Sequence, residues 1–461
     1  MENNSKVIDL VVSNDLCIGC GLCTYTCTNK SLQMSTNKFG FYVPQQVGNC
    51  DCDGSCLNVC PFNPKPDKKI KSENELANIF LKDTELTHPR IGKYKGTFIG
   101  YSNDFRLSSS SGGMATFILS ELIERGIVDH VFSVSGGESG KHYEYNIASN
   151  KTDLLNSSKT RYYPVTLSNV FSKIDKIEGK VAVVGVGCFI KAIRLAQYAD
   201  NQLKIKIPFL VGIICGGVKS SFFTDYVSST IGMENNNYKN PEYRIKDYHS
   251  SAGDYSFSST SKVDNKKRSI KMKEMGDMWG SGLFKANACD FCDDVTTELA
   301  DISLGDAWLD PYDKDGKGTS VILTRSNISH QIIIEGIKNK KLNVDPLSLE
   351  KFLHSQRGSF SHRQDSIHYR KKKAKRMTPP KRIIVNKPIS LDFKIVQLFR
   401  MITRKKSLSI WSNHPNHKVF KRKMKGFMFS LKIATLIYHL KRSLDNGNLL
   451  IKIKNKYWKQ K

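Results

Sequence analysis

The sequence lacks the features of an exported protein. No basic segment followed by an apolar run opens its 461 residues, so we expect a cytoplasmic location. It also lacks an apolar run long enough to cross a bilayer, because the mainly apolar stretch at residues 426–440 is short and is interrupted by Lys432. No Ser/His/Asp set or pair of carboxylates with acid–base spacing stands out. Any chemistry should therefore belong mainly to cofactors.

Acidic residues are scarce in one part of the chain. Residues 351–461 hold 30 of the 71 Lys and Arg residues but only 3 of the 43 Asp and Glu residues, so nearly all of the net charge of +28 lies there. The body before residue 351 is electrically balanced, and a nucleic-acid partner is not indicated. The basic tail instead predicts binding to an anionic surface.

Two amphipathic patterns, residues 393–405 and 420–440, predict helices in this tail. Four basic residues cluster at the start of the second pattern. We expect this helix to lie on the anionic inner face of the membrane. The alternative is packing on the protein's own body or on an acidic partner. The apolar face of the second pattern holds Phe420, Met424, Phe427, Leu431, Ala434 and Tyr438.

Cysteine is plentiful, but disulfide bonds are not expected, because nothing in the sequence directs export. Eight of the 12 cysteines lie before residue 61, which predicts a small metal-binding module over residues 9–66. Its first group has the 2-2-3 spacing of bacterial ferredoxins. A second group follows a strand predicted at residues 39–44. The two groups are Cys17, Cys20, Cys23, Cys27 and Cys50, Cys52, Cys56, Cys60.

We expect two 4Fe–4S clusters in this module, each taking its fourth cysteine from the other group. Asp53 stands where the usual spacing has cysteine, and Thr28 replaces the usual proline after Cys27. Cys52 would therefore reach in from an altered loop. Zinc, which also takes four thiolates, is the alternative. The first cluster is assigned to Cys17, Cys20, Cys23 and Cys60, and the second to Cys27, Cys50, Cys52 and Cys56.

Four further cysteines are predicted to meet at one edge of a parallel sheet. Two apolar, β-branched runs are typical of buried strands and lead directly to Cys188 and Cys215. A Cys289-x-x-Cys292 pair follows later. Because parallel strands end at the same edge, these four thiols can hold a third iron–sulfur cluster where open α/β sheets bind ligands.

A Ser/Gly loop, Ser110-Ser111-Gly112-Gly113, opens a predicted helix. Its free N–H groups and hydroxyls suit the phosphate of a dinucleotide, and a serine-capped tight turn is the alternative. The cationic and aromatic segment 157–164, with Lys159, either grips a phosphate and stacks on a planar ring or forms a solvated loop. Lys219, beside a glycine turn, and Asp306, at a strand end, are further candidate cofactor ligands.

The remaining pattern alternates between strands and helices. Residues 248–269 are too polar for a core and long for a plain loop, so we expect a mobile or disordered segment there. Strands are predicted over residues 97–101, 127–134, 181–187, 208–214 and 320–324, and helices over residues 73–80, 190–198 and 331–338.

These motifs, in this order, resemble the family of coenzyme F420 hydrogenase/dehydrogenase beta subunits, in the bacterial branch with an N-terminal 4Fe–4S dicluster ferredoxin domain. The resemblance implies a flavin, FAD or another, held by Ser111, Gly112, Gly113 and Lys159. It also implies the third cluster on Cys188, Cys215, Cys289 and Cys292. One departure is Gly187-Cys188, where the family usually has Pro-Cys. The tail beyond about residue 350 has no counterpart in the family.

The predicted fold is an α+β dicluster ferredoxin module followed by an α/β mixed-sheet flavin/iron–sulfur domain and a basic helical tail. The predicted function is an iron–sulfur flavoprotein oxidoreductase that exchanges electrons with a redox partner protein or a small carrier, such as a deazaflavin. The alternatives are a non-enzymatic electron-transfer subunit and a membrane-docked accessory protein of envelope polysaccharide assembly. The predicted domains are residues 9–66, 90–175, 176–350 and 351–461.

Overall fold

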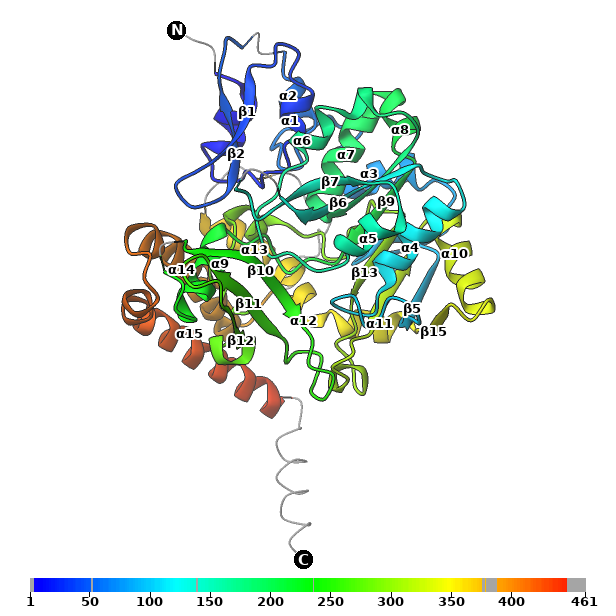
Figure 1. Ribbon diagram of the computed structural model, residues 1–461. Coiled ribbons are helices and arrows are strands. Elements are labelled where there is room, and N and C mark those ends of the chain that lie inside the picture. Colours follow the sequence, from blue (N-terminus) through cyan, green and yellow to red (C-terminus); the bar gives the residue numbers. More distant parts are fainter. Residues whose placement is uncertain are drawn as a thin grey trace, which may run out of the picture.

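The computed structural model describes residues 4–50, 53–137, 140–234, 236–374, 378 and 388–445. An N-terminal module, residues 4–66, stands at one end of the molecule (Figure 1). Its antiparallel hairpin covers the short helical turns that carry the cysteines, and the strand predicted at 39–44 begins three residues later. The elements are η1 (Ile8–Val12), α1 (Leu22–Tyr25), β1 (Leu32–Thr36), β2 (Tyr42–Gln46) and α2 (Ser55–Asn58).

An eight-stranded mixed sheet forms the centre of the molecule, which confirms the predicted mixed α/β architecture. Its four middle strands run parallel, and antiparallel strands flank them on both sides. In spatial order the strands are β15 (Leu342–Pro346), β5 (Gly96–Ser102), β14 (Ser320–Thr324), β13 (Ile302–Asp306), β9 (Phe209–Ile213), β8 (Val181–Val186), β6 (His130–Gly136) and β7 (Tyr143–Ala148).

Helices cover both faces of this sheet (Figure 1). Along β8, Val181 and Val183 enter one core, whereas Ala182 enters the core on the opposite face, as the two-residue period of a strand requires. Both faces are therefore buried, which explains the continuous apolar runs in the sequence. One face carries α3 (Glu73–Phe80), α7 (Gly187–Ala199) and α8 (Asn201–Lys206), and the other carries α4 (Met114–Glu124), α5 (Lys151–Asn156) and α10 (Asn327–Lys338).

A second, three-stranded antiparallel sheet includes much of the segment expected to be mobile or disordered, so that expectation was wrong. Ser258 and Ser259 are fully buried, and cross-strand backbone hydrogen bonding holds the segment although its side chains are polar. Phe257 joins the core that this sheet forms with α9. The elements are α9 (Ser221–Thr230), β10 (Tyr238–Ile245), β11 (Ser256–Ser261), β12 (Lys267–Lys271) and η3 (Met272–Met275).

The predicted tail is helical over most of its described residues, and it packs against the body through α14 and the first turns of α15. The two longest helices, α14 and α15, lie side by side (Figure 1). Phe420, Met424 and Leu431, on the predicted apolar face of α15, are at most 5% exposed and pack on the protein itself. The elements are α11 (Leu349–Ser355), α12 (Arg357–Phe360), η6 (Ser361–Asp365), α13 (Ile367–Ala374), α14 (Leu391–Asn413) and α15 (His417–Asp445).

Two predicted elements are confirmed to the residue, the helix at residues 73–80 and the strand at residues 320–324. None of the helices that the structure describes combines the length and the apolar character needed to cross a membrane. The remaining short elements are β3 (Leu86–His88), β4 (Gly92–Tyr94), α6 (Ser168–Phe171), η2 (Ile174–Lys176), η4 (Asn287–Phe291) and η5 (Tyr312–Lys314).

Candidate metal centre and cofactor cavity

The structure brings together the four cysteines assigned to the third cluster, hereafter the sheet-edge cysteines. Cys188 lies in the first turn of α7, directly after β8, and Cys215 follows β9. Cys289 lies in η4 and Cys292 immediately after it. Burial raises the pKa of Cys188 well above its usual value, and the nearby charges of Cys292, Cys215 and Cys289 raise it further. Thiols distant in the sequence therefore face one another at the carboxyl edge of the sheet.

The surroundings of these thiols suit an iron–sulfur cluster, because backbone N–H groups donate to two of the sulfur atoms and so offset part of the effect of burial, which raises their pKa. The Gly217 N–H donates to Cys215 Sγ at 3.2 Å, and the Val218 N–H donates to Cys289 Sγ at 3.3 Å. The N-terminal end of α7 places the positive end of the helix dipole at Cys188. Among the residues that the structure describes, no three His, Cys, Asp or Glu side chains gather tightly enough to share a single metal ion.

Gly187 has a steric reason to replace the usual proline before Cys188. A Cβ atom at Gly187 would lie 2.4 Å from Asp294 Oδ2. The Asp294 carboxylate accepts a hydrogen bond from the Glu298 N–H at 3.2 Å and so holds the segment after Cys292. A larger residue at position 187 would displace this carboxylate.

The N-terminal module contains a small cavity lined by the four cysteines assigned to the first cluster. Burial raises the pKa of Cys17 to about 12 and that of Cys20 to about 11. The Gly19 N–H donates to Cys17 Sγ at 3.4 Å, as expected around a cluster ligand. The cysteines that line the cavity are Cys17, Cys20, Cys23 and Cys60.

The cysteines assigned to the second cluster are only partly described. Cys27 Sγ lies 3.3 Å from Ser31 Oγ, and Cys56 Sγ lies 3.3 Å from Ser5 Oγ. Cys50 is half-buried, and Cys52 lies outside the described residues. The part of this site that Cys52 would complete therefore stays a prediction.

A cavity of about 690 Å³ opens between the carboxyl edge of the large sheet and the three-stranded sheet. Gly112 lies behind the cavity wall, because its N–H donates to Ser320 Oγ at 3.2 Å and a Cβ there would lie 2.7 Å from Gly100 O. All other predicted cofactor-binding residues line this cavity, namely Ser110, Ser111, Gly113, Lys159, Lys219 and Asp306.

Positive charge gathers at the end of the cavity that holds the Ser/Gly loop. Lys246 Nζ donates to Ser111 O at 2.7 Å and to Arg106 O at 2.6 Å, so it fixes the loop. Burial and the neighbouring charges of Lys159 and Arg106 lower the pKa of Lys246 to about 7. Burial, and then Arg161, also lower the pKa of Lys159. Cations that repel one another in this way are stabilised by an anion, which fits a phosphate.

Another part of the cavity wall is aromatic. Trp279 and Tyr162 line it with their ring centroids 4.6 Å apart, and Lys219 Nζ lies 4.6 Å from the Trp279 centroid. Lys219 Nζ also donates to Met278 O at 2.7 Å. Burial and the charge of Lys285 lower the pKa of Lys219 to about 7. Lys219 therefore holds the turn that carries the indole.

Asp306 is paired with a cation that sequence reasoning missed. Its carboxylate forms an ion pair with Arg244, whose side chain is 9% exposed. Arg244 lies near the end of β10 and Lys246 directly follows the strand, and this two-residue spacing of positive charge was an available signal. Trp279 was missed as well, although a tryptophan between glycines 276 and 280 is unusual enough to have drawn notice.

The cavity and the cysteine sites lie beside one another. Cys215 lines the cavity, and so does Ile18, which lies between two cysteines of the N-terminal module. Tyr145 also lines the cavity, and burial, followed by the charges of Cys188 and Cys20, raises its pKa above the usual value. Tyr145 is therefore close to one thiol of the sheet edge and one of the module.

Two family models match the chain, and both describe parts of redox enzymes. The model for the N-terminal part of the coenzyme F420 hydrogenase/dehydrogenase beta subunit matches residues 97–172, and the model for the C-terminal part matches residues 178–350. The protein is therefore an oxidoreductase with an electron-transfer role. It belongs to the family of coenzyme F420 hydrogenase/dehydrogenase beta subunits.

Curated relatives agree with this assignment. The chain is 25% identical over 359 residues to the coenzyme F420-dependent sulfite reductase of Methanocaldococcus jannaschii, and the match covers 74% of this chain but only 48% of that protein. It is also 24% identical over 285 residues to the beta subunit of the coenzyme F420 hydrogenase of Methanococcus voltae, covering 57% and 92% of the two chains. The chain thus spans about half the length of the reductase.

Among solved structures, the chain is similar to a component of the F420-reducing [NiFe] hydrogenase complex from Methanosarcina barkeri. The superposition has a TM-score of 0.48 at 20% sequence identity and covers 62% of this chain and 96% of that one.

Proposed function

We propose that the protein is an iron–sulfur flavoprotein that passes electrons between a two-electron carrier, such as a deazaflavin, and 4Fe–4S clusters. The observation that carries this proposal is the position of Cys215, which belongs to the sheet-edge cysteines and lines the large cavity. A bound flavin supplies the exchange between paired and single electrons. Cys215 would bring a cluster ligand directly to the flavin site.

The cationic end of the cavity supports binding of a flavin dinucleotide such as FAD. Ser110 and Ser111 present the loop, and Lys159 adds an exposed cation at the cavity wall. Ser110 Oγ accepts a hydrogen bond from the Thr160 N–H at 2.9 Å, which joins the loop to the Lys159 segment. These residues would bind the pyrophosphate and orient it.

The aromatic part of the wall supports binding of the planar ring system. Trp279 and Tyr162, both partly buried, offer faces and edges on which a planar ring can stack. The Arg244–Asp306 pair lies at the same cavity and would hydrogen-bond to polar atoms of the ring. No acid–base residue is needed in this scheme beyond the groups that position the ring.

The proximity of Cys188 to Cys20 supports an order for the electron path. The sheet-edge cysteines would receive electrons from the cavity, and the N-terminal module would relay them outward to a redox partner, or the reverse. The module stands at one end of the molecule, where a partner protein can approach it (Figure 1).

Anaerobic purification, with iron, acid-labile sulfide, zinc and flavin measured per chain, tests this function. The proposal expects about twelve irons and one flavin, as three four-iron clusters require. About twelve irons without flavin would favour a non-enzymatic electron-transfer subunit. Two or more zinc ions in place of iron would overturn the metal assignment.

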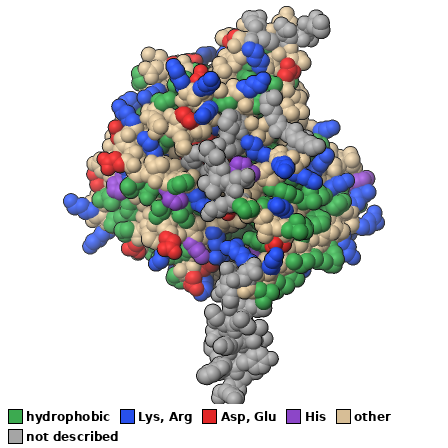
Figure 2. Space-filling view, turned by 180° about the vertical axis from the view of Figure 1, so that it is seen from behind, with side chains coloured by type: hydrophobic (Ala, Val, Ile, Leu, Met, Phe, Trp, Pro, Cys, Tyr) green, Lys and Arg blue, Asp and Glu red, His purple; other side chains and the backbone are tan. Residues whose placement is uncertain are grey.

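We also propose that α15 contacts an anionic membrane surface. Its outward side exposes an apolar stripe in which Phe429 is 63% exposed and Leu436 is 57% exposed, and exposed Lys425 and Lys432 flank it. Figure 2 shows apolar and basic side chains next to one another over this part of the surface. This mixture is typical of interfacial helices. The exposed apolar residues of α15 are Phe429, Ile433, Leu436, Ile437, Leu440 and Leu444.

Co-sedimentation with vesicles tests this contact. The chain should sediment with vesicles that contain phosphatidylglycerol but not with purely zwitterionic vesicles, and the double variant F429S/L436S should stay in the supernatant. The matched control is V263S, because Val263 is 79% exposed and lies outside α15, between β11 and β12. Equal sedimentation of F429S/L436S and the unsubstituted chain would refute a role for this face.

A further inference from the structure

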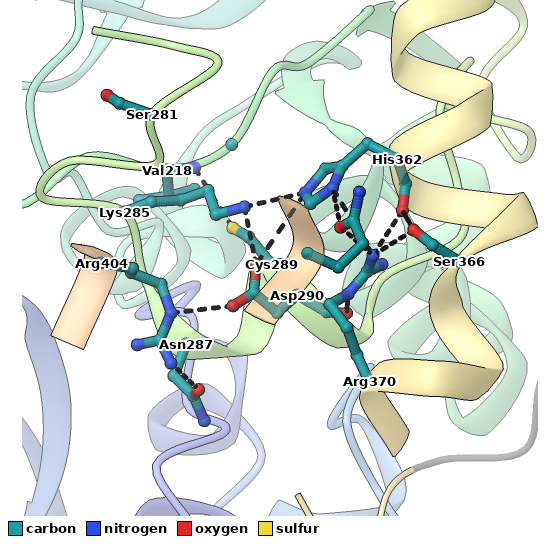
Figure 3. A network of polar contacts seen from close by, with 12 residues as sticks. Val218, Ser281, Lys285, Asn287, Cys289, Asp290, His362, Ser366, Arg370 and Arg404 are labelled. Carbon is teal, nitrogen blue, oxygen red and sulfur yellow. Dashed lines mark hydrogen bonds and ion pairs between the residues drawn. The ribbon is translucent and has the colours of Figure 1, made fainter. Parts of the chain in front are cut away.

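The loop between Cys289 and Cys292 is surrounded by basic side chains (Figure 3). The Asp290 carboxylate lies 2.7 Å from Lys285 Nζ and 2.8 Å from Arg404 Nε. Arg404 also donates to Asn287 Oδ1 at 2.6 Å. Because all these side chains are nearly buried, the loop cannot move without separating charges.

The backbone of both cysteine loops is held from the same side. Arg363 Nη1 donates to Cys215 O at 2.6 Å, Gln364 Nε2 donates to Asp293 O at 3.0 Å, and Arg370 Nε donates to Asp290 O at 2.7 Å. These donors lie after residue 350, where the match to the family models ends. The C-terminal segment of this chain therefore completes the surroundings of the sheet-edge cysteines.

Arg363 differs from the other cations in its charge partners. Lys285 and Arg404 are neutralised by Asp290, whereas Arg363 forms no ion pair with a carboxylate of the described residues. Its guanidinium instead donates to the backbone of Cys215, one of the sheet-edge cysteines.

The buried position of Arg363 brings its positive charge to the loop that carries Cys215. Arg363 comes from η6, a π-helical turn of the kind that often occurs at functional sites. Its guanidinium is 5% exposed, so solvent screens it little.

We propose that Arg363 is a positioning residue that raises the reduction potential of the third cluster. Reduction adds one electron to the cluster and forms or breaks no bond, so the site gains one negative charge. A buried guanidinium at Cys215, with no carboxylate ion-pair partner among the described residues, stabilises the reduced state more than the oxidised state. In turnover the electron comes from the bound flavin. This inference rests on the proposed function, because it requires the third cluster.

Redox titration with dithionite, followed by electron paramagnetic resonance, tests the role of this charge in R363Q, R363K and R357Q. Arg357 is the matched control, because it is an exposed arginine on the neighbouring α12 that faces His354 at 3.2 Å. A C289S variant identifies which signal belongs to the third cluster. R363Q should lower the midpoint potential of that signal by at least about 59 mV, a tenfold change for a one-electron step. R363K and R357Q should keep the original potential.

The outcomes separate this inference from the proposed function. If the unsubstituted chain holds about eight irons, the third cluster is absent and the proposed function fails first. If it holds about twelve and the R363Q potential equals that of R357Q, the inference is overturned. If R363Q loses iron, the R363K variant decides between the two explanations. An unchanged midpoint potential in R363K supports the role of charge. A lowered midpoint potential in R363K assigns the effect to hydrogen-bond geometry and overturns the inference.

Discussion

Replacing Asp290 by asparagine tests how strongly the C-terminal helices hold the cysteine loop. The amide would leave Lys285 and Arg404 buried without their anion, and the Asp290 side chain is only 3% exposed. Removing one partner of a buried ion pair costs about 3–5 kcal/mol. We expect the free energy of unfolding of D290N to fall by that amount. Each kcal/mol lowers the midpoint temperature by about 2–4 °C in a domain of 150–250 residues.

Thermal unfolding followed by circular dichroism measures this loss, with D310N as the matched control. The Asp310–Lys314 pair has the same 2.7 Å separation, but its side chains are 69% and 71% exposed. Exposed pairs contribute little, so D310N should unfold near the unsubstituted chain. A D290N midpoint equal to that of D310N would refute the reasoning, because burial would then not distinguish the two pairs.

The same substitution should change the pH dependence of stability. Burial alone would raise the pKa of Asp290, but Lys285, Arg404 and Arg370 outweigh burial and hold this pKa well below its usual value. The stabilisation is therefore present above about pH 4, the unfolded-state pKa of aspartate, and is lost as the pH falls towards the lowered pKa. The free energy of unfolding of D290N should therefore fall less steeply with decreasing pH than that of the unsubstituted chain. An equal fall in the two proteins would contradict this prediction.

Three further predictions concern the clusters, the cavity and the module. C289S should retain about eight of about twelve irons by iron analysis, and retention of all of them would remove Cys289 from the ligands. K159M should weaken flavin binding about 10- to 100-fold by fluorescence titration, since a charge-assisted hydrogen bond contributes about 1.5–3 kcal/mol, and unchanged affinity would place the phosphate elsewhere. G21A should expose the N-terminal module to limited proteolysis, because its Cβ would lie 2.2 Å from Thr166 Oγ1. Gly126 also has a positive φ but has open space around it, so equal proteolysis of G126A and G21A would exclude the steric cause.

The strands that carry Cys188 and Cys215 could be predicted because burial on both faces leaves a continuous apolar run that ends at a turn. The strand at residues 256–261 could not, because its buried Ser258 and Ser259 have no apolar pattern. That strand is held by its neighbours in the sheet, and pairing between distant strands leaves little trace in the local sequence.

The surroundings of the candidate site were the least predictable part. The periodicity of α15 indicates that Phe420 and Met424 share a face, but a face that packs on protein and one that packs on lipid have the same pattern. Arg363 and Arg404 belong to a basic segment that composition alone assigns to solvent or an anionic surface. Only the tertiary structure places them beside Asp290 and the cysteines.

Anomalous diffraction at the iron edge, from crystals grown without oxygen, tests the central claim most directly. The account predicts an iron density centred among the Sγ atoms of Cys188, Cys215, Cys289 and Cys292, with a flavin in the cavity that Cys215 lines. Absence of iron at that edge, with the four sulfur atoms unligated in protein shown to contain iron elsewhere, would contradict it.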